Sequence, residues 1–242
     1  MRDAVSPRPA ALEHEDPPMP RDVPPPEACV SLADLVDELV PKIPSKVARE
    51  QLRRVRTLPV EMRIVGERPN LLDPNPPKLE PRRQIWMRVT KVQAHGLDEC
   101  CAAYFSDHML LVTALLPHGV HFPSPALGVV ASLDHAMWFH APFHADDWIL
   151  YDVHSPRLAD GRGLAVGHMY SSATGRLCVT SVQEGLLRLA QPSVARSAAH
   201  LWLRLNALYE NLRAGTAFNT SMKTAPRRSP PAVGGDAVAS ER

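Results

Sequence analysis

The stretch Gly128–Phe143, GVVASLDHAMWFHAPF, decides how the rest of the chain is interpreted. It opens with a short run of β-branched and small apolar residues that follows two prolines, and such a run predicts a buried strand rather than a helix. Polar side chains then interrupt the apolar run: Ser132, Asp134, His135 and His140. Because side chains alternate across a strand, we expect Ser132 and Asp134 on one face and His135 on the other.

Polar groups in so apolar a strand cost free energy unless they are paired or used. One interpretation is that they anchor a turn through hydrogen bonds to neighbouring backbone. The other is that they belong to a functional site, and the residues of this stretch leave both open.

The composition excludes several classes of partner. A net charge of +1 gives no reason to expect nucleic acid or an anionic membrane surface. The four cysteines show neither a disulfide framework nor metal-ligand spacing, so we expect reduced thiols, an intracellular compartment and no metal or other cofactor. We expect no membrane span and no signal peptide, and the C-terminal residues are not the Ser-Lys-Leu tripeptide of peroxisomal import.

Proline content divides the chain into four segments. Residues 1–28 are proline-rich and predict an extended or disordered linker remnant. Residues 29–59 predict a helical linker in which Ser31 caps a helix that prolines interrupt. Residues 60–190 carry the main domain. Residues 191–242 predict a variable C-terminal extension, largely disordered, with one amphipathic helix candidate at 198–212.

Inside the main domain, the pattern predicts two strands, one long buried helix and four further strands. The strands are expected at 60–67, 84–92, 127–133, 147–153, 163–171 and 176–189. Turn residues are expected at Ser155–Pro156, Asp160–Gly161 and 172–175. The helix should run from Asp98 to about Leu116 and is apolar nearly all round. One buried helix with an antiparallel meander predicts an α+β protein whose sheet wraps around that helix.

Two polar residues stand out inside these elements. Asp107 is expected in the middle of the apolar helix, where a carboxylate must be satisfied or functional, although Ser106 and His108 beside it could simply form a small polar patch. Gln183 shares a strand face with Ser181 and should point inward, where its amide needs partners at both ends.

Four segments together resemble the acyl-CoA thioesterase II family, which includes bacterial medium- and long-chain thioesterases and the eukaryotic peroxisomal acyl-CoA thioesterase. They are SDHMLLVTALLPH (106–118), ASLDHAMWFHAPF (131–143), WILYDVHSP (148–156) and VTSVQEGLLR (179–188). The resemblance runs from about residue 24 to residue 189. It implies a hotdog fold, a sheet wrapped around one long central helix, and hydrolysis of acyl-CoA to free fatty acid and CoA in fatty acid metabolism. It also implies the peroxisomal matrix, or otherwise the cytosol.

Members of this family look like two hotdog halves in one chain, and this sequence resembles the linker and the second half. The resemblance therefore implies a homodimer or pairing with another hotdog unit. The alternative function is a non-catalytic half that serves as an acyl-binding or assembly partner.

The family's catalytic Asp, Ser or Thr, and Gln fall on Asp107, Ser132 and Gln183. Asp134 and His135 then become structural supports. The resemblance assigns no substrate-binding residue; Arg157, Arg162 and the cluster at 53–56 are candidates for contacts with the CoA phosphates. A Ser–His–Asp mechanism is the weaker interpretation, because Ser132 lies outside any G-x-S-x-G elbow.

Overall fold

The computed structural model describes residues 12–43, 46–70, 73, 75–90, 96–120, 122, 124 and 126–190. All of these residues belong to one compact unit. The predicted extension at 191–242, with its helix candidate, lies outside the described residues.

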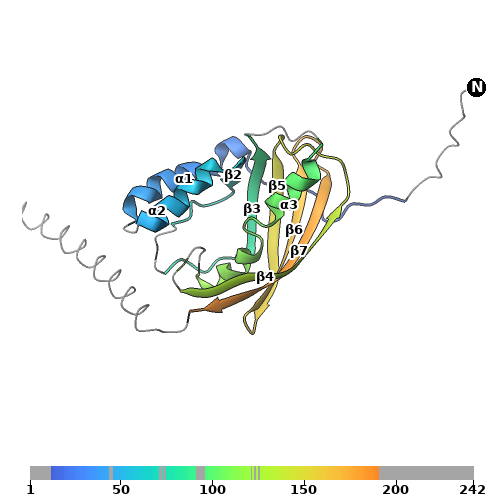
Figure 1. Ribbon diagram of the computed structural model, residues 1–242. Coiled ribbons are helices and arrows are strands. Elements are labelled where there is room, and N and C mark those ends of the chain that lie inside the picture. The colour runs from blue at the N-terminus through green and yellow to red at the C-terminus, as the bar shows by residue number, and fades with distance from the viewer. Residues whose placement is uncertain are drawn as a thin grey trace, which may run out of the picture. The chain divides into compact units, whose positions relative to one another are not determined.

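The described residues form one antiparallel sheet with short helices (Figure 1). Its strands are β1 (Val30–Ser31), β2 (Val60–Ile64), β3 (Arg82–Val89), β4 (Leu127–Phe139), β5 (Ile149–Ala159), β6 (Arg162–Ser171) and β7 (Leu177–Leu189). They pair in the order β1-β2-β3-β5-β6-β7-β4. The helices are α1 (Leu32–Leu39), α2 (Lys46–Arg53) and α3 (Asp98–Ser106). Short 3-10 segments are η1 (Pro26–Ala28), η2 (Val40–Lys42), η3 (Arg54–Thr57) and η4 (Leu111–His118).

The main core lies between α3 and one face of the sheet (Figure 1). Alternation along β3 directs Ile85 and Met87 to this face, where they join Phe105 of α3 in one buried cluster. Trp86 points the other way, into a smaller cluster on the opposite face. An antiparallel sheet packed around one central helix is the hotdog arrangement, and the predicted α+β fold class is confirmed.

The N-terminal segment lies against the opposite face of the sheet. The Trp86 indole donates to the carbonyl of Pro24 at 2.9 Å, and the Tyr170 hydroxyl donates to that of Pro17 at 3.0 Å. Residues 12–25 form neither a helix nor a strand. The segment ends at α1, where Ser31 accepts the Asp34 amide at 3.4 Å, as its predicted capping role requires.

The predicted long helix is interrupted. α3 ends at Ser106, and the backbone turns before η4 continues the segment to His118. Met109 lies in this turn with φ of 64°, a left-handed conformation that costs a non-glycine residue about 1–2 kcal/mol. Asp107 therefore caps the end of α3 instead of sitting inside a continuous buried helix, and its side chain is exposed.

By length and composition alone, the segment Asp98–His118 could cross a membrane, which the sequence analysis did not anticipate. Half of its most apolar stretch is buried inside the protein. A helix enclosed by a sheet passes the same test because it too is apolar nearly all round. The segment is therefore weak evidence for a membrane span.

The predicted turn at Ser155–Pro156 is wrong. β5 continues through both residues as a bulge between His154 and Arg157 and turns only at Asp160–Gly161. Proline has no amide hydrogen for the ladder, and a bulge accommodates it without ending the strand. The Ser155 hydroxyl stabilises the bulge by donating to the Leu164 carbonyl at 2.6 Å.

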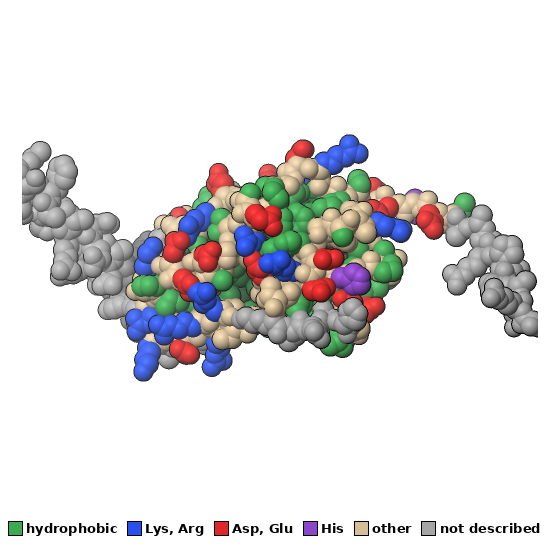
Figure 2. Space-filling model, turned by 90° about the horizontal axis from the view of Figure 1, so that it is seen from above, with side chains coloured by type: hydrophobic (Ala, Val, Ile, Leu, Met, Phe, Trp, Pro, Cys, Tyr) green, Lys and Arg blue, Asp and Glu red, His purple; other side chains and the backbone are tan. Residues whose placement is uncertain are grey.

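Charged side chains of both signs are interspersed with apolar ones on the face seen in Figure 2, in keeping with the net charge of +1. Edge strand β4 is different in character. It is the last strand of the sheet order, and beside the exposed Asp134 and His135 it exposes five large apolar side chains. They are Val129, Val130, Leu133, Trp138 and Phe139.

Candidate active site

A bulge in β4 determines which side chains face the core. Ser132 pairs with Gly185 and Asp134 with Glu184, so Leu133 is left without a partner in the ladder. The extra residue reverses the alternation beyond it. Ser132 and His135 therefore lie on the same face as Gln183, and Asp134 lies on the other. The expectation that Ser132 and Asp134 share a face is wrong for this reason.

Asp134 stabilises the bulge from the outer face. Its Oδ1 accepts the backbone amide of Glu184 at 2.9 Å. The structural role expected for Asp134 agrees with this contact, which fixes the register next to Ser132.

Gln183 is the centre of the candidate site. It is 1% exposed, and its Nε2 lies 3.0 Å from Asp107 Oδ1 and 3.0 Å from Ser132 Oγ. The acid comes from the end of α3, the hydroxyl from β4 and the amide from β7. The structure thus brings together all three residues predicted from the sequence, although Asp107 and Gln183 are 76 positions apart.

The orientation of the Gln183 amide follows from its neighbours. If its oxygen faced Asp107, two acceptors would meet at hydrogen-bond distance, so the nitrogen must face the carboxylate. Oε1 is then buried with no hydrogen-bond partner among the described residues. An unmade bond of this kind costs about 1–3 kcal/mol. Hydrogen bonds to Nε2 therefore fix the orientation of the Gln183 amide, while its Oε1 is left without a partner among the described residues. The sequence alone did not predict this.

A fourth side chain, His135, reaches the same amide. Its Nδ1 lies 3.4 Å from Gln183 Nε2, and its Nε2 lies 3.0 Å from the hydroxyl oxygen of Ser106. Ser106 is fully buried at the end of α3. From the sequence, His135 was expected on the face opposite to Ser132. That expectation is wrong because the bulge at Leu133 cannot be recognised without the pairing of β4 with β7.

Tyr151 of β5 holds the end of α3 in place through hydrogen bonds. Its hydroxyl donates to the Ser106 carbonyl at 2.9 Å and lies 2.8 Å from Ser181 Oγ. Burial raises the pKa of Tyr151, so its hydroxyl keeps its proton across the neutral range. These bonds fix the residue that immediately precedes Asp107.

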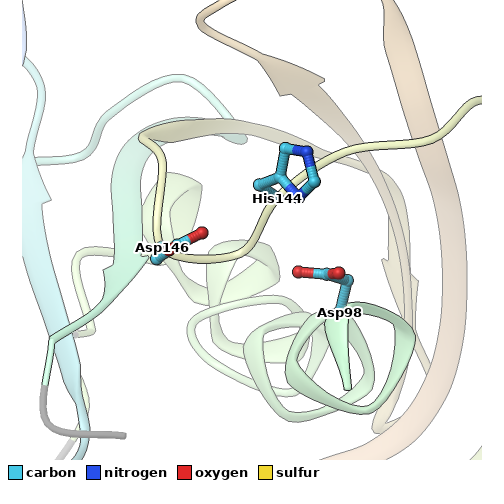
Figure 3. A group of neighbouring side chains, drawn as sticks. All are labelled: Asp98, His144 and Asp146. Carbon is cyan, nitrogen blue, oxygen red and sulfur yellow. The ribbon is translucent and has the colours of Figure 1, made fainter. Parts of the chain in front are cut away.

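A second group of polar side chains lies at the other end of α3. Asp98, His144 and Asp146 place ligand-type atoms within 4.8 Å of one another (Figure 3). Asp98 Oδ1 already accepts the Ala145 amide at 2.8 Å and so ties the loop after β4 to the start of the helix. His144 and Asp146 are exposed. The group has a structural explanation, and we assign no metal to it.

Three of the arginines considered for CoA phosphates are engaged within the protein, among them Arg53, which lies 3.6 Å from Glu50. Arg162 pairs with Glu184, and Arg56 pairs with Asp37. Arg157 is exposed in β5 beyond the bulge. Their roles toward CoA stay predictions.

The fold and the site define the class: a hotdog protein that carries an acid, a hydroxyl and an amide at the broken end of its central helix. Comparison with known proteins gives the family. The sequence model described as acyl-CoA thioesterase matches residues 61–186, and the chain belongs to the acyl-CoA thioesterase family.

The similar proteins carry consistent names. Mouse acyl-coenzyme A thioesterase 8 is 38% identical over 203 residues, which cover 78% of this chain and 58% of the mouse protein. Acyl-CoA thioesterase 2 of Haemophilus influenzae is 41% identical over 95 residues, covering 39% of this chain and 32% of that protein. Acyl-CoA thioesterase II TesB2 of Mycobacterium marinum has a similar structure, with a TM-score of 0.51 and 33% identity over 75% of this chain and 59% of the other. The chain thus spans little more than half the length of these mammalian and mycobacterial relatives.

Proposed function

We propose that this protein hydrolyses acyl-CoA thioesters to free fatty acid and CoA, with water as the direct nucleophile. The observation that carries the proposal is the convergence of Asp107, Ser132 and Gln183 around one amide nitrogen. Family membership supports the substrate class, since the relatives are named for acyl-CoA thioesters.

Each of the three side chains has a chemical role in this proposal. Asp107 is exposed, and no hydrogen bond within the described residues reaches its Oδ2. That oxygen accepts a proton from water while the water oxygen bonds to the thioester carbonyl carbon. Ser132 and Gln183 hold the water and the carboxylate in a reactive orientation. The carbon–sulfur bond then breaks, its electron pair goes to sulfur, and the CoA thiolate takes the proton from Asp107.

The alternative of a non-catalytic, acyl-binding half is not favoured. A half that served only for assembly would have no need to bury a glutamine with an unpaired oxygen beside an acid and a hydroxyl.

Hydrolysis is tested with the full chain and a panel of acyl-CoAs of different chain lengths. In a single turnover in ¹⁸O-water we expect the label in the released fatty acid and no covalent adduct in the intact protein mass. An acyl adduct on Ser132, or an unlabelled acid, would overturn direct attack by water. Hydrolysis no faster than in buffer for every chain length would overturn the function.

We also propose that β4 pairs with a hotdog unit of a second copy of this chain. β4 is 13 residues long, and its outer edge is free of hydrogen-bonded strands among the described residues. Its exposed side chains include Leu133 at 47% and Trp138 at 51%. A long apolar strand at a sheet edge is a template for pairing with another chain.

If β4 pairs with a second copy of the chain, we expect the wild-type protein to have twice its 26.7 kDa chain mass in solution. The double variant Leu133→Lys/Trp138→Lys should elute as a monomer, because charged side chains on an edge strand oppose pairing. Light scattering after size exclusion gives both masses. Leu79→Lys, a change at an equally exposed leucine outside β4, should stay dimeric. A wild-type monomer at every concentration would refute the pairing.

The domain limits and the compartment are proposals of the same kind. The family match at 61–186 supports a catalytic domain at 60–190 preceded by a linker at 29–59. A yeast relative named peroxisomal acyl-coenzyme A thioester hydrolase 1 is 32% identical over 83 residues, which supports the peroxisome as the compartment to examine first.

A further inference from the structure

His135 is exposed on β4, and its ring contacts both the buried end of α3 and the proposed site. It stands directly opposite Gln183 in the pairing of β4 with β7. One ring nitrogen faces the buried hydroxyl of Ser106 at 3.0 Å, and the other faces the Gln183 amide nitrogen at 3.4 Å. A side chain that merely filled space would need neither contact.

The hydrogen bonds of Ser106 determine the tautomer of His135. The Ser106 hydroxyl has one hydrogen to donate, and its oxygen lies 2.7 Å from the Ala103 carbonyl, the nearest acceptor. The Ser106 oxygen must therefore accept from His135, and the proton of a neutral ring resides on Nε2. Nδ1 is left with a lone pair that points to the Gln183 amide.

Gln183 Nε2 then has more acceptors than hydrogens. Its two hydrogens face three acceptors: Asp107 Oδ1, Ser132 Oγ and His135 Nδ1. The third acceptor can hold the amide in place when Ser132 or Asp107 turns toward water or substrate. Without it, release of either bond would leave a buried N–H unpaired, at a cost of about 1–3 kcal/mol.

From this geometry we infer that His135 is a positioning residue of the same site: as the neutral Nε2–H tautomer, anchored on Ser106, it holds the Gln183 amide while Ser132 and Asp107 act. The inference rests on the proposed thioester hydrolysis and assigns His135 a role beyond structural support.

Two substitutions of His135 test the contacts of its two ring nitrogens separately. His135→Asn places an amide oxygen near the position of Nδ1 and loses the contact with Ser106. His135→Gln extends to the position of Nε2 and loses the acceptor for Gln183. We expect kcat to fall about tenfold in His135→Gln, with KM changed less than about threefold. His135→Asn should keep kcat within about threefold of wild type, although glutamine is closer to histidine in size.

His140→Asn is the matched control, because this histidine follows the same strand and bonds instead to Thr180 at 2.9 Å. Its kinetics should match those of wild type. Equal losses in His135→Asn and His135→Gln, or no loss in either, would refute a positioning role.

The tautomer is measured separately from activity. Side-chain ¹⁵N spectra of histidine-labelled full chain, assigned with His135→Asn, should show the proton of the neutral His135 ring on Nε2. A proton on Nδ1 would overturn the inference whether or not thioesters are hydrolysed. Absence of hydrolysis in wild type, with the Nε2–H tautomer present, would instead count against the proposed function alone.

Discussion

Asp107→Asn should lower kcat for acyl-CoA hydrolysis by about a thousandfold, within the range of about 10²–10⁴ that a general base contributes. The substitution removes the charge and the proton-accepting capacity. It keeps an amide oxygen that can still accept the Gln183 Nε2–H bond, so the arrangement around Gln183 should survive. KM should change little, because the missing interaction is one made in the transition state.

Steady-state rates with one saturating acyl-CoA measure this effect, and urea unfolding checks the fold. Glu99→Gln is the matched control, since Glu99 is an exposed acid in the first turn of the same helix. It should keep the wild-type rate. If Asp107→Asn kept more than about a tenth of wild-type kcat, Asp107 would not be the base.

Gly167→Ala should lower the free energy of unfolding by about 3 kcal/mol, the upper part of the usual range for overpacking a core. A methyl group at this position in β6 would lie 2.6 Å from the Tyr151 hydroxyl oxygen and 2.7 Å from Cζ of the ring. Tyr151 is fully buried and cannot move aside without losing its bonds to Ser106 and Ser181. Because those bonds hold the end of α3, activity should fall together with stability.

Gly175→Ala provides the comparison. Gly175 lies in the β6–β7 turn with φ of 69°, and nothing lies within 4 Å of an added methyl group. Its substitution should cost only the backbone strain, about 1 kcal/mol. Urea denaturation followed by circular dichroism measures both variants. Equal losses in the two glycine variants would show that the core beside Tyr151 has room for the methyl group.

Local sequence patterns predicted the strands β2 to β7 and the face that Gln183 presents, but not the two-residue β1. In β2, Val60, Met62 and Ile64 are buried and alternate with the less buried Glu61 and Arg63, so this strand could be predicted from spacing alone. The family resemblance, rather than periodicity, identified Ser132 as the residue to place beside Asp107. Three of its four quoted motifs fall on β4, β5 and β7, and the fourth runs from the end of α3 through η4.

The wrong predictions, namely the face of His135, the turn at Ser155–Pro156 and the continuous long helix, have one physical origin. The bulges at Leu133 and at Ser155–Pro156 exist because a partner strand sets the register, and no local pattern records how the partner pairs. The end of α3 at Ser106 depends likewise on Tyr151, which comes 45 positions later. Sequence reasoning therefore succeeded where neighbours along the chain decide the structure and failed where distant ones do.

The sheet order has a consequence for biosynthesis. β4 precedes β5 in the chain, but among the described strands it pairs only with β7, whose last residue is 50 positions beyond the end of β4. During translation the apolar β4 emerges from the ribosome well before the strand that will cover one of its edges. Nascent chains stalled after β4 has left the ribosome and before β7 has left it should consequently recruit chaperones more strongly than chains from which all of β7 has emerged.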